Sequence, residues 1–480
     1  MFSNILSKIK NQKVLSNGLT YLFFSVFTQV VGLLYTPILT RNLSIEDYGS
    51  YNLILSVQGI LAILFTLCLG SGFSRFYNEV KNKNLFINSV INLHYVLGIS
   101  SLFLIITFNS FFSNILFGSL NNASEYLIYL GVLSLLGGVI SIYEIKYSME
   151  YKAKQASLIN FIRIVVRLGS VFLLSMTGTL DVKLLLTVQI VINLFIFMGL
   201  FFTNRKTYKL EVDFILVKPA LKFGTGLILG SVSTWVLSLI DRRFISEYHG
   251  LSDVGIYSLA ATIGMLISPV FLTPFRKVFT PFKFSVYNKP GGKDKIIHFY
   301  NVYIFLCVLC VLGLSLYGEL LIHILATKEY YEAAKIIPLI AISYFFWGLN
   351  EFYGLGVNIK NKTFINSLIA GSAALMNVLL NVLLVPNYGI YGAAVATIMS
   401  YFFTNVIYFV SLKVYFNIEI KYYNWIKFFF VYLSLFGVHL YLDLNLIPDF
   451  FLNLFLIFLY ILTCFGFKFI TPKAFKSIKI

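Results

Sequence analysis

Fourteen apolar runs, each about as long as a bilayer is thick, divide this chain almost from end to end. A helix needs about 20 apolar residues to cross the hydrocarbon core of a membrane. The runs occupy residues 16–40, 48–73, 85–108, 126–147, 156–176, 184–202, 223–240, 254–275, 296–317, 336–357, 364–384, 389–412, 425–442 and 450–469. Of the 480 residues, 58% are hydrophobic and 12% are charged, so one soluble core could not bury the apolar surface. We therefore predict an all-α integral membrane protein with fourteen transmembrane helices.

The charges between the runs predict on which side of the membrane each loop lies. If the N-terminus is cytoplasmic, every predicted inside segment carries net positive charge and no predicted outside loop does, as the cytoplasmic preference of Lys and Arg requires. We therefore expect both termini in the cytoplasm. The net charge of +17 then reflects topology and attraction to anionic lipids, and it calls for no nucleic-acid partner. The first run follows a basic segment and lacks a small-residue cleavage site, so we expect no cleaved signal peptide.

A short motif occurs twice and divides the chain into comparable halves. Residues 43–53 read LSIEDYGSYNL and residues 251–259 read LSDVGIYSL. Ser and Asp accept hydrogen bonds from the free N–H groups of a starting helix, and Gly allows close packing. We therefore predict two pseudo-symmetric six-helix lobes, 1–202 and 223–412, followed by two C-terminal helices in 413–480. A cytoplasmic linker at 203–222, either a tether or a surface helix, joins the lobes. A chance likeness between two helical hairpins is the alternative.

Two arginines in the fifth run are the most informative polar residues. Arg163 and Arg167 lie four residues apart, hence on one helical face, and Arg167 falls near the bilayer midplane. An ionised arginine at that depth needs a partner or an aqueous cavity, and a guanidinium group binds phosphate well. The alternatives are structural pairing with Glu144 or Glu351, or, for Arg163, snorkelling to the interface.

Charges near the helix ends complete the candidate set. The candidates for contact with an anionic ligand are Arg41, Arg75, Arg163, Arg167, Arg242 and Arg243. Arg75 is alternatively an anchor at the cytoplasmic interface. The candidates for ion coupling are Asp241 and Glu351, of which Glu351 would otherwise pair with a neighbouring arginine.

Other polar or special residues are interpreted as structural. Asn377 and Asn381 share a helical face and predict hydrogen bonds between helices. His94 lies inside an apolar run, where a packing histidine is expected. Cys307 and Cys310 form a C-x-x-C with no second pair or nearby His, so no metal site is predicted. Prolines near the repeated motif, Pro37, Pro269 and Pro274, predict bent helices, or for Pro37 a helix end.

No catalytic motif or extended loop accompanies these runs. The sequence has no Walker A lysine motif, no H-E-x-x-H and no G-x-S-x-G, and His249 and His323 have no other catalytic residues around them. A membrane polymerase or acyltransferase is therefore disfavoured, and we expect neither enzyme activity nor a cofactor. Repeated halves, bent helices and buried charge of both signs are typical of a secondary transporter.

Three segments resemble a known family. LTRNLSIEDYGSYNLILS (39–56), DRRFISEYHGLSDVGIYSLA (241–260) and AALMNVLLNVLLVPNYGIYGAAVATIMSY (373–401) are similar to recurrent segments of bacterial polysaccharide biosynthesis proteins of the O-antigen flippase (Wzx) type. These belong to the multidrug/oligosaccharidyl-lipid/polysaccharide exporter superfamily. The resemblance implies a two-lobed, fourteen-helix protein of the bacterial inner membrane with a cationic cavity for a diphosphate.

The function that this resemblance implies is translocation of an undecaprenyl-diphosphate-linked oligosaccharide from the inner to the outer leaflet by alternating access, driven by an ion gradient. The implied partners are the lipid-linked glycan, membrane lipids, a polysaccharide polymerase and glycosyltransferases. A multidrug or cation antiporter of the same superfamily is an alternative, which predicts twelve helices and an acidic cavity. A flippase for lipid-linked peptidoglycan precursor is another.

Overall fold

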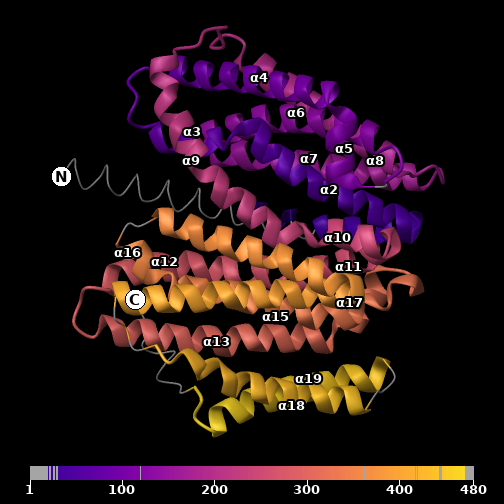
Figure 1. Ribbon diagram of the computed structural model, residues 1–480, viewed down its shortest axis with the longest axis vertical. Helices are drawn as coiled ribbons and strands as arrows, with labels where there is room; N and C mark the ends of the chain where they lie inside the picture. Colours follow the sequence, from indigo (N-terminus) through magenta and orange to yellow (C-terminus); the bar gives the residue numbers. More distant parts are fainter. Residues whose placement is uncertain are drawn as a thin grey trace. The chain divides into compact units, whose positions relative to one another are not determined.

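In the part of the chain that the structure describes, every regular element is a helix (Figure 1). The computed structural model describes residues 20, 23–24, 27–28, 31–118, 120–360, 363–416, 418, 420–442 and 446–470. Their contacts divide the chain into two compact units, Met1–Trp235 and Val236–Ile480. The prediction of an all-α protein is confirmed.

Twelve helices within the described residues are long and apolar enough to cross a membrane. The chain is therefore a multi-pass integral membrane protein. One of these helices, α17 (Thr363–Tyr415), contains Gly389 at φ 52° and ψ −131°, a conformation that interrupts a helix, so α17 consists of two helices. The first predicted run, 16–40, lies partly outside the described residues; residues 31–42 are helical, and a bend follows at Leu43.

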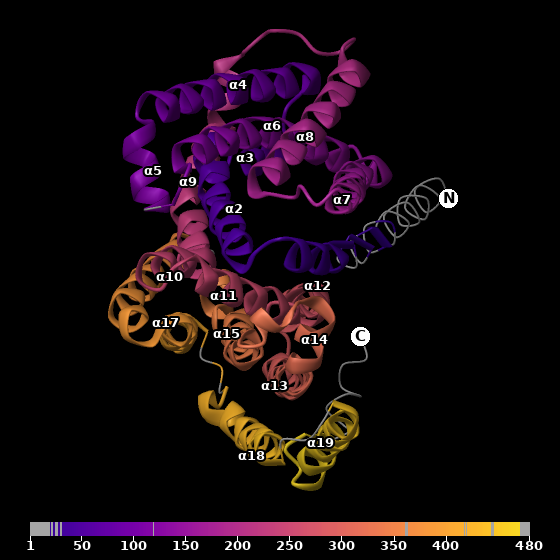
Figure 2. The same ribbon diagram turned by 90° about the vertical axis from the view of Figure 1, so that its right-hand side faces the viewer.

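The first unit is built around α6 (Ala123–Met149). This helix packs against α2 (Ile45–Thr66), α3 (Leu69–Phe76), α4 (Lys83–Thr107), α5 (Asn109–Phe117), α7 (Ala153–Ser175) and α8 (Val182–Asn204) (Figure 2). Leu67 and Cys68 adopt left-handed backbone angles between α2 and α3, so the second transmembrane run is broken there. In α6, 61% of the apolar part is buried, whereas in α7 only 11% is buried, which places α7 at the periphery of the unit.

The second unit is built in a similar way around α15 (Ala333–Tyr353). Its neighbours are α11 (Leu251–Gly264), α13 (Gly292–Leu316), α14 (Gly318–Leu325), α16 (Leu355–Ile359) and α17. The short helix α10 (Asp241–Tyr248) packs against α11 and α17, and α12 (Thr273–Val286) packs against α13. The last two helices, α18 (Ile426–Leu442) and α19 (Leu446–Gly466), lie against α13 and against each other (Figure 1).

The prolines act differently in the two units. Pro269 lies in a π-helical turn, Ser268–Leu272, between α11 and α12, and Pro274 begins α12. The eighth predicted run is therefore irregular where a bend was expected. Pro37 lies within the helical segment 31–42, so the helix does not end at this proline.

The predicted linker at 203–222 is partly helical. Helix α9 (Phe214–Leu239) begins inside it, and the Asp213 carboxylate accepts a hydrogen bond from the Leu216 N–H (3.0 Å) at its start. A side-chain cap of this kind stabilises a helix start. The non-helical connection is therefore limited to residues 205–213.

The repeated motif starts a helix in both units, but only one copy uses its serine as a cap. Ser44 Oγ accepts from the Asp47 N–H (3.1 Å) and donates to the Asp47 carboxylate (2.7 Å) at the start of α2. In the second copy, α11 follows Gly250 at φ 89°, and no side chain caps it. The expectation of a Ser or Asp cap is thus confirmed for the first copy and wrong for the second, where glycine provides the turn.

Candidate functional site

The repeated motif supplies a buried tyrosine to a polar cluster in each unit. Tyr51 of α2 forms a hydroxyl–hydroxyl contact with Tyr35 (3.4 Å), and Tyr257 of α11 donates to the Asp241 carboxylate (2.6 Å). In both cases the partner lies 16 residues before the tyrosine. The likeness between the two units therefore extends to a pair of equivalent contacts with the preceding helix.

In the first unit this cluster contains Arg167. Its guanidinium donates to the Tyr51 hydroxyl and lies 4.6 Å from the centre of the Tyr35 ring. Gln189 of α8 donates to the same hydroxyl (2.9 Å). Among the residues that the structure describes, no carboxylate lies within 4.0 Å of Arg167. Its positive charge is therefore solvated by phenol groups and π electrons but is not neutralised.

Arg163 is neutralised, although it lies one turn away on the same helix. It contacts the Glu144 carboxylate of α6 (3.4 Å) and donates to the Asn160 side chain (3.1 Å). Structural pairing with Glu144, one of the two alternatives for this residue, is confirmed. The two arginines of the fifth run therefore have different electrostatic surroundings.

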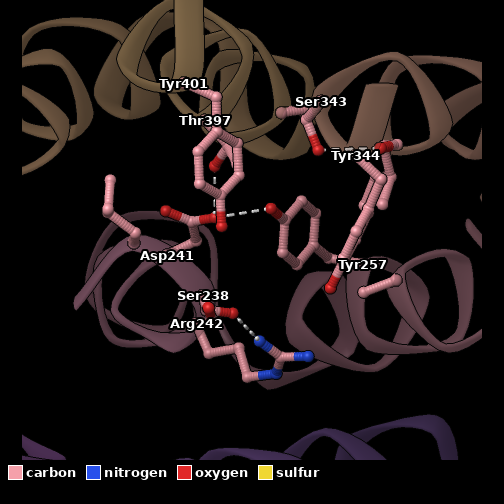
Figure 3. A pocket seen from close by; sticks show the side chains of 12 residues that line it. Ser238, Asp241, Arg242, Tyr257, Ser343, Tyr344, Thr397 and Tyr401 are labelled. Carbon is pink, nitrogen blue, oxygen red and sulfur yellow. Dashed lines mark hydrogen bonds between the residues drawn. The ribbon is translucent and has the colours of Figure 1, made fainter. Parts of the chain in front are cut away.

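In the second unit the cluster is organised around Asp241, which is 2% exposed (Figure 3). Its Oδ2 accepts from Tyr257 (2.6 Å) and Thr397 (2.8 Å), and its Oδ1 accepts from Asn381 (2.9 Å). Asn381 also donates to the Asn377 carbonyl (2.9 Å). The predicted role of Asn381 in hydrogen bonding between helices is confirmed, because it joins α17 to α10.

Arg242 lies beside this carboxylate but does not contact it directly. It donates to the Ser258 hydroxyl (3.1 Å) and to the Ser238 carbonyl (3.3 Å). A cavity of about 30 Å³ opens between these groups, lined by Leu237, Ser238, Asp241, Arg242, Tyr257, Ala261, Ile340, Ser343, Tyr344, Ala394, Thr397 and Tyr401. That volume is enough for a water molecule or a small cation.

Glu351 forms a third cluster with two cations of α12. Its carboxylate contacts Arg276 (2.8 Å) and Lys283 (3.1 Å). The Arg276 guanidinium also lies 3.9 Å from the centre of the Trp347 ring, a strong cation–π geometry. Glu351 is therefore the partner of neighbouring cations, as one of its two interpretations predicted.

The remaining sequence candidates lie outside these clusters. Arg75 pairs with Glu79 and its side chain is 52% exposed. Arg243 pairs with Glu247 (2.6 Å), and Arg41 is exposed at the end of the first helical segment.

Sequence reasoning missed most of the uncharged partners of the buried charges. These are Tyr35, Tyr51, Gln189, Tyr257 and Thr397. Tyrosine is common in membrane helices, so only its recurrence in the repeated motif was a usable signal. Arg276 and Lys283 were missed because they follow the end of the predicted run at residue 275.

His94 is packed tightly in the first unit, and the four cysteines form no disulfide. The buried His94 ring contacts the Leu135 carbonyl (3.1 Å), and a Cβ added to Gly138 would lie 2.2 Å from the ring. This close packing confirms that His94 is a packing histidine. Within the described residues, no three His, Cys, Asp or Glu side chains are placed to hold a metal ion.

Comparison with known families and proteins gives one family match. The model of a family described as polysaccharide biosynthesis protein matches residues 38–335. An uncharacterized membrane protein of Methanocaldococcus jannaschii is 24% identical over 258 residues, and the match covers 50% of both chains. The chain thus spans about half the length of that relative.

Two other relatives match over most of their length. The capsular polysaccharide biosynthesis protein CapF of Staphylococcus aureus is 25% identical over 393 residues, which cover 77% of this chain and 91% of the relative. The probable low-salt glycan biosynthesis flippase Agl15 of Haloferax volcanii is 21% identical over 388 residues, covering 80% of each.

Solved structures share the fold. The lipid II flippase MurJ in an inward closed conformation has a TM-score of 0.76 at 16% identity and covers 93% of this chain and 98% of its own. An inward-facing multidrug resistance transporter of the MATE family, within the MOP superfamily, has a TM-score of 0.58 at 14% identity, covering 82% and 96%. At these identities the likeness is one of fold.

Proposed function

Because the chain belongs to the polysaccharide biosynthesis protein family, we propose that it is a flippase for undecaprenyl-diphosphate-linked oligosaccharides. It moves them from the inner to the outer leaflet of a bacterial cytoplasmic membrane by alternating access, without carrying out chemistry on them. Relatives named for capsular polysaccharide and glycan biosynthesis support this function, and so does the fold shared with a lipid II flippase. The proposal includes fourteen transmembrane helices with both termini in the cytoplasm.

The observation that carries the proposal is the environment of Arg167. Its charge lies in a membrane-spanning helix with tyrosine partners and, among the described residues, no carboxylate within ion-pairing distance. Arg75, Arg163 and Arg243 are each paired with a glutamate. A diphosphate would supply the anion that Arg167 lacks, and arginine binds phosphate oxygens in a bidentate geometry. We assign Arg167 as the principal diphosphate contact.

Asp241 is the proposed site of ion coupling. Its carboxylate accepts hydrogen bonds from the neutral side chains of Tyr257, Asn381 and Thr397, and a small cavity adjoins it. A proton or a sodium ion bound there would neutralise the buried charge. Glu351 is less suited to this role because Arg276 and Lys283 already balance its charge.

A multidrug or cation antiporter is the second candidate. The fold shared with a MATE transporter and the buried Asp241 favour it, since a cationic drug needs a carboxylate. The uncompensated Arg167 opposes it, because its charge would repel such a substrate. A flippase for lipid-linked peptidoglycan precursor differs from the main proposal in the glycan alone.

Deletion of the gene distinguishes these functions. We expect lipid-linked repeat units to accumulate on the cytoplasmic face of the membrane, and surface polysaccharide to return with the wild-type gene but not with Arg167→Ala. Accumulation is measured in inverted and right-side-out vesicles with a glycan-binding lectin that does not cross membranes. If the deletion strain has an unchanged amount of lipid-linked units on the cytoplasmic face and is more sensitive to cationic drugs, the flippase proposal is rejected.

A further inference from the structure

The connection between α8 and α9 is fixed to α4 along its length. Asn88 donates to the Thr207 carbonyl (3.2 Å) and the Glu211 carboxylate (2.9 Å). Asn92 donates to the carbonyls of residues 209 and 211 (2.9 Å each). Four residues apart, these two amides lie on one face of α4. The segment 205–213 is therefore a docked strap and not a loose tether.

An apolar groove of about 660 Å³ lies between this strap and α4. Its lining residues are Asn92, Tyr95, Val96, Ile99, Ser100, Phe103, Leu210 and Val212. Val96, Phe103 and Leu210 are 61%, 67% and 88% exposed. Such exposure of large apolar side chains in a membrane protein marks a surface that lipid hydrocarbon covers.

The groove is about as long as one leaflet is thick. Its polar end is Asn92, which accepts a hydrogen bond from Tyr208 (2.6 Å). Near that end Lys146 donates to Asn204 (2.6 Å), in a group of tyrosines and a lysine typical of a membrane interface. By the positive-inside pattern this is the cytoplasmic interface. From Asn92 to Phe103 α4 rises roughly 16 Å, about half of the ~30 Å hydrocarbon thickness.

The strap carries positive charge at the polar end of the groove. Arg205, Lys206 and Lys209 are exposed, whereas the carboxylate of Glu211 accepts from Asn88 on α4. We propose that the groove binds one anionic phospholipid of the cytoplasmic leaflet, with an acyl chain between α4 and Leu210 and the phosphate against Lys206 and Lys209. The test of this site measures resident lipid and not flipping, so its outcome does not depend on the proposed function.

Native mass spectrometry of the purified full-length protein tests the charge. The protein is mixed in detergent with equal amounts of phosphatidylglycerol and phosphatidylcholine of identical chains. We expect wild type to retain phosphatidylglycerol preferentially, and Lys206→Gln/Lys209→Gln to lower that preference about five-fold for each lysine. The matched control Lys81→Gln/Lys154→Gln removes two exposed lysines elsewhere in the same unit and should leave the preference unchanged.

A second pair of variants tests the groove. Leu210→Ser/Val212→Ser should lower retention of both lipids while keeping their ratio. Because both side chains are exposed (88% and 49%), we expect the fold to be unchanged. The headgroup site would be overturned if wild type showed no preference for phosphatidylglycerol. It would also be overturned if the strap variant and its matched control lost the same amount of that preference. Unchanged retention in the serine variant would overturn the acyl-chain site.

Discussion

Arg167 lies where α7 meets α2 and the first helical segment, with its charge held by phenol groups. Because a lysine cannot form the same planar pair of hydrogen bonds, we expect Arg167→Lys to lose transport nearly as fully as Arg167→Ala. Loss of a charged hydrogen bond of about 1.5–3 kcal/mol predicts a drop of roughly 10- to 100-fold. The measurement is the flipping rate of a fluorescent lipid-linked oligosaccharide in proteoliposomes.

The control for this residue is Arg75→Lys. Arg75 is exposed and paired with Glu79, four residues further along the chain, and surface pairs of this kind contribute little. The variant should transport at a rate close to that of wild type. Full activity of Arg167→Lys would contradict bidentate phosphate binding, and equal loss in both variants would show that the effect is not specific to the position of Arg167.

One substitution of Asp241 removes its charge while keeping the fold, so the effect of the charge on transport can be measured by itself. Asp241→Asn keeps the shape of the side chain. Asn381, whose own Oδ1 has no hydrogen-bond partner among the described residues, can rotate its amide to accept from the new amide. We therefore expect a change in unfolding free energy of no more than about 1 kcal/mol but loss of the dependence of transport on an ion gradient. Thermal unfolding and flipping with and without an imposed gradient measure the two effects. Gradient-dependent flipping by this variant would exclude Asp241 from coupling.

At the scale of elements, the sequence predicts the positions of the helices more accurately than their first and last residues. The apolar runs correctly indicate helices in each described region, because burial in lipid requires hydrogen-bonded backbone. The start of α9 at Phe214 was missed because its first residues include Lys218 and Pro219, which a hydropathy pattern excludes. Cluster partners were missed for a different reason: Tyr51 and Arg167 are 116 residues apart, and hydropathy gives depth in the membrane but not which helices meet.

The break inside α17 depends on one glycine. Gly389 has φ 52° and ψ −131°, a region that other residues avoid, and the atoms nearest an added Cβ are no closer than 3.5 Å. Gly389→Ala should therefore destabilise the protein through backbone strain, by about 1–3 kcal/mol. Gly437→Ala in α18, which meets nothing within 4 Å, is the control and should stabilise by about 0.5–1 kcal/mol. Thermal unfolding in detergent compares them, and equal effects would refute the argument from strain.

At the scale of the whole molecule, the charge pattern predicts the orientation of every loop. Because Lys and Arg stay on the cytoplasmic side, cysteines introduced at Lys81 and Lys289 should react with a membrane-impermeant maleimide only after the cells are permeabilised. Cysteines at Thr179 and Lys328 should react in intact cells. All four positions are exposed. The four native cysteines are buried or half-buried, so labelling of the wild-type protein measures the background reaction.

The order of these four positions makes the test sensitive to the number of spans. Lys81 lies between α3 and α4, Thr179 between α7 and α8, Lys289 between α12 and α13, and Lys328 between α14 and α15. With fourteen helices and a cytoplasmic N-terminus, the sides alternate as inside, outside, inside and outside. One missing or additional span anywhere between Lys81 and Lys328 would reverse the labelling of every later position. Labelling of Lys289→Cys in intact cells would therefore contradict the topology on which the cytoplasmic placement of the lipid groove and the direction of flipping both depend.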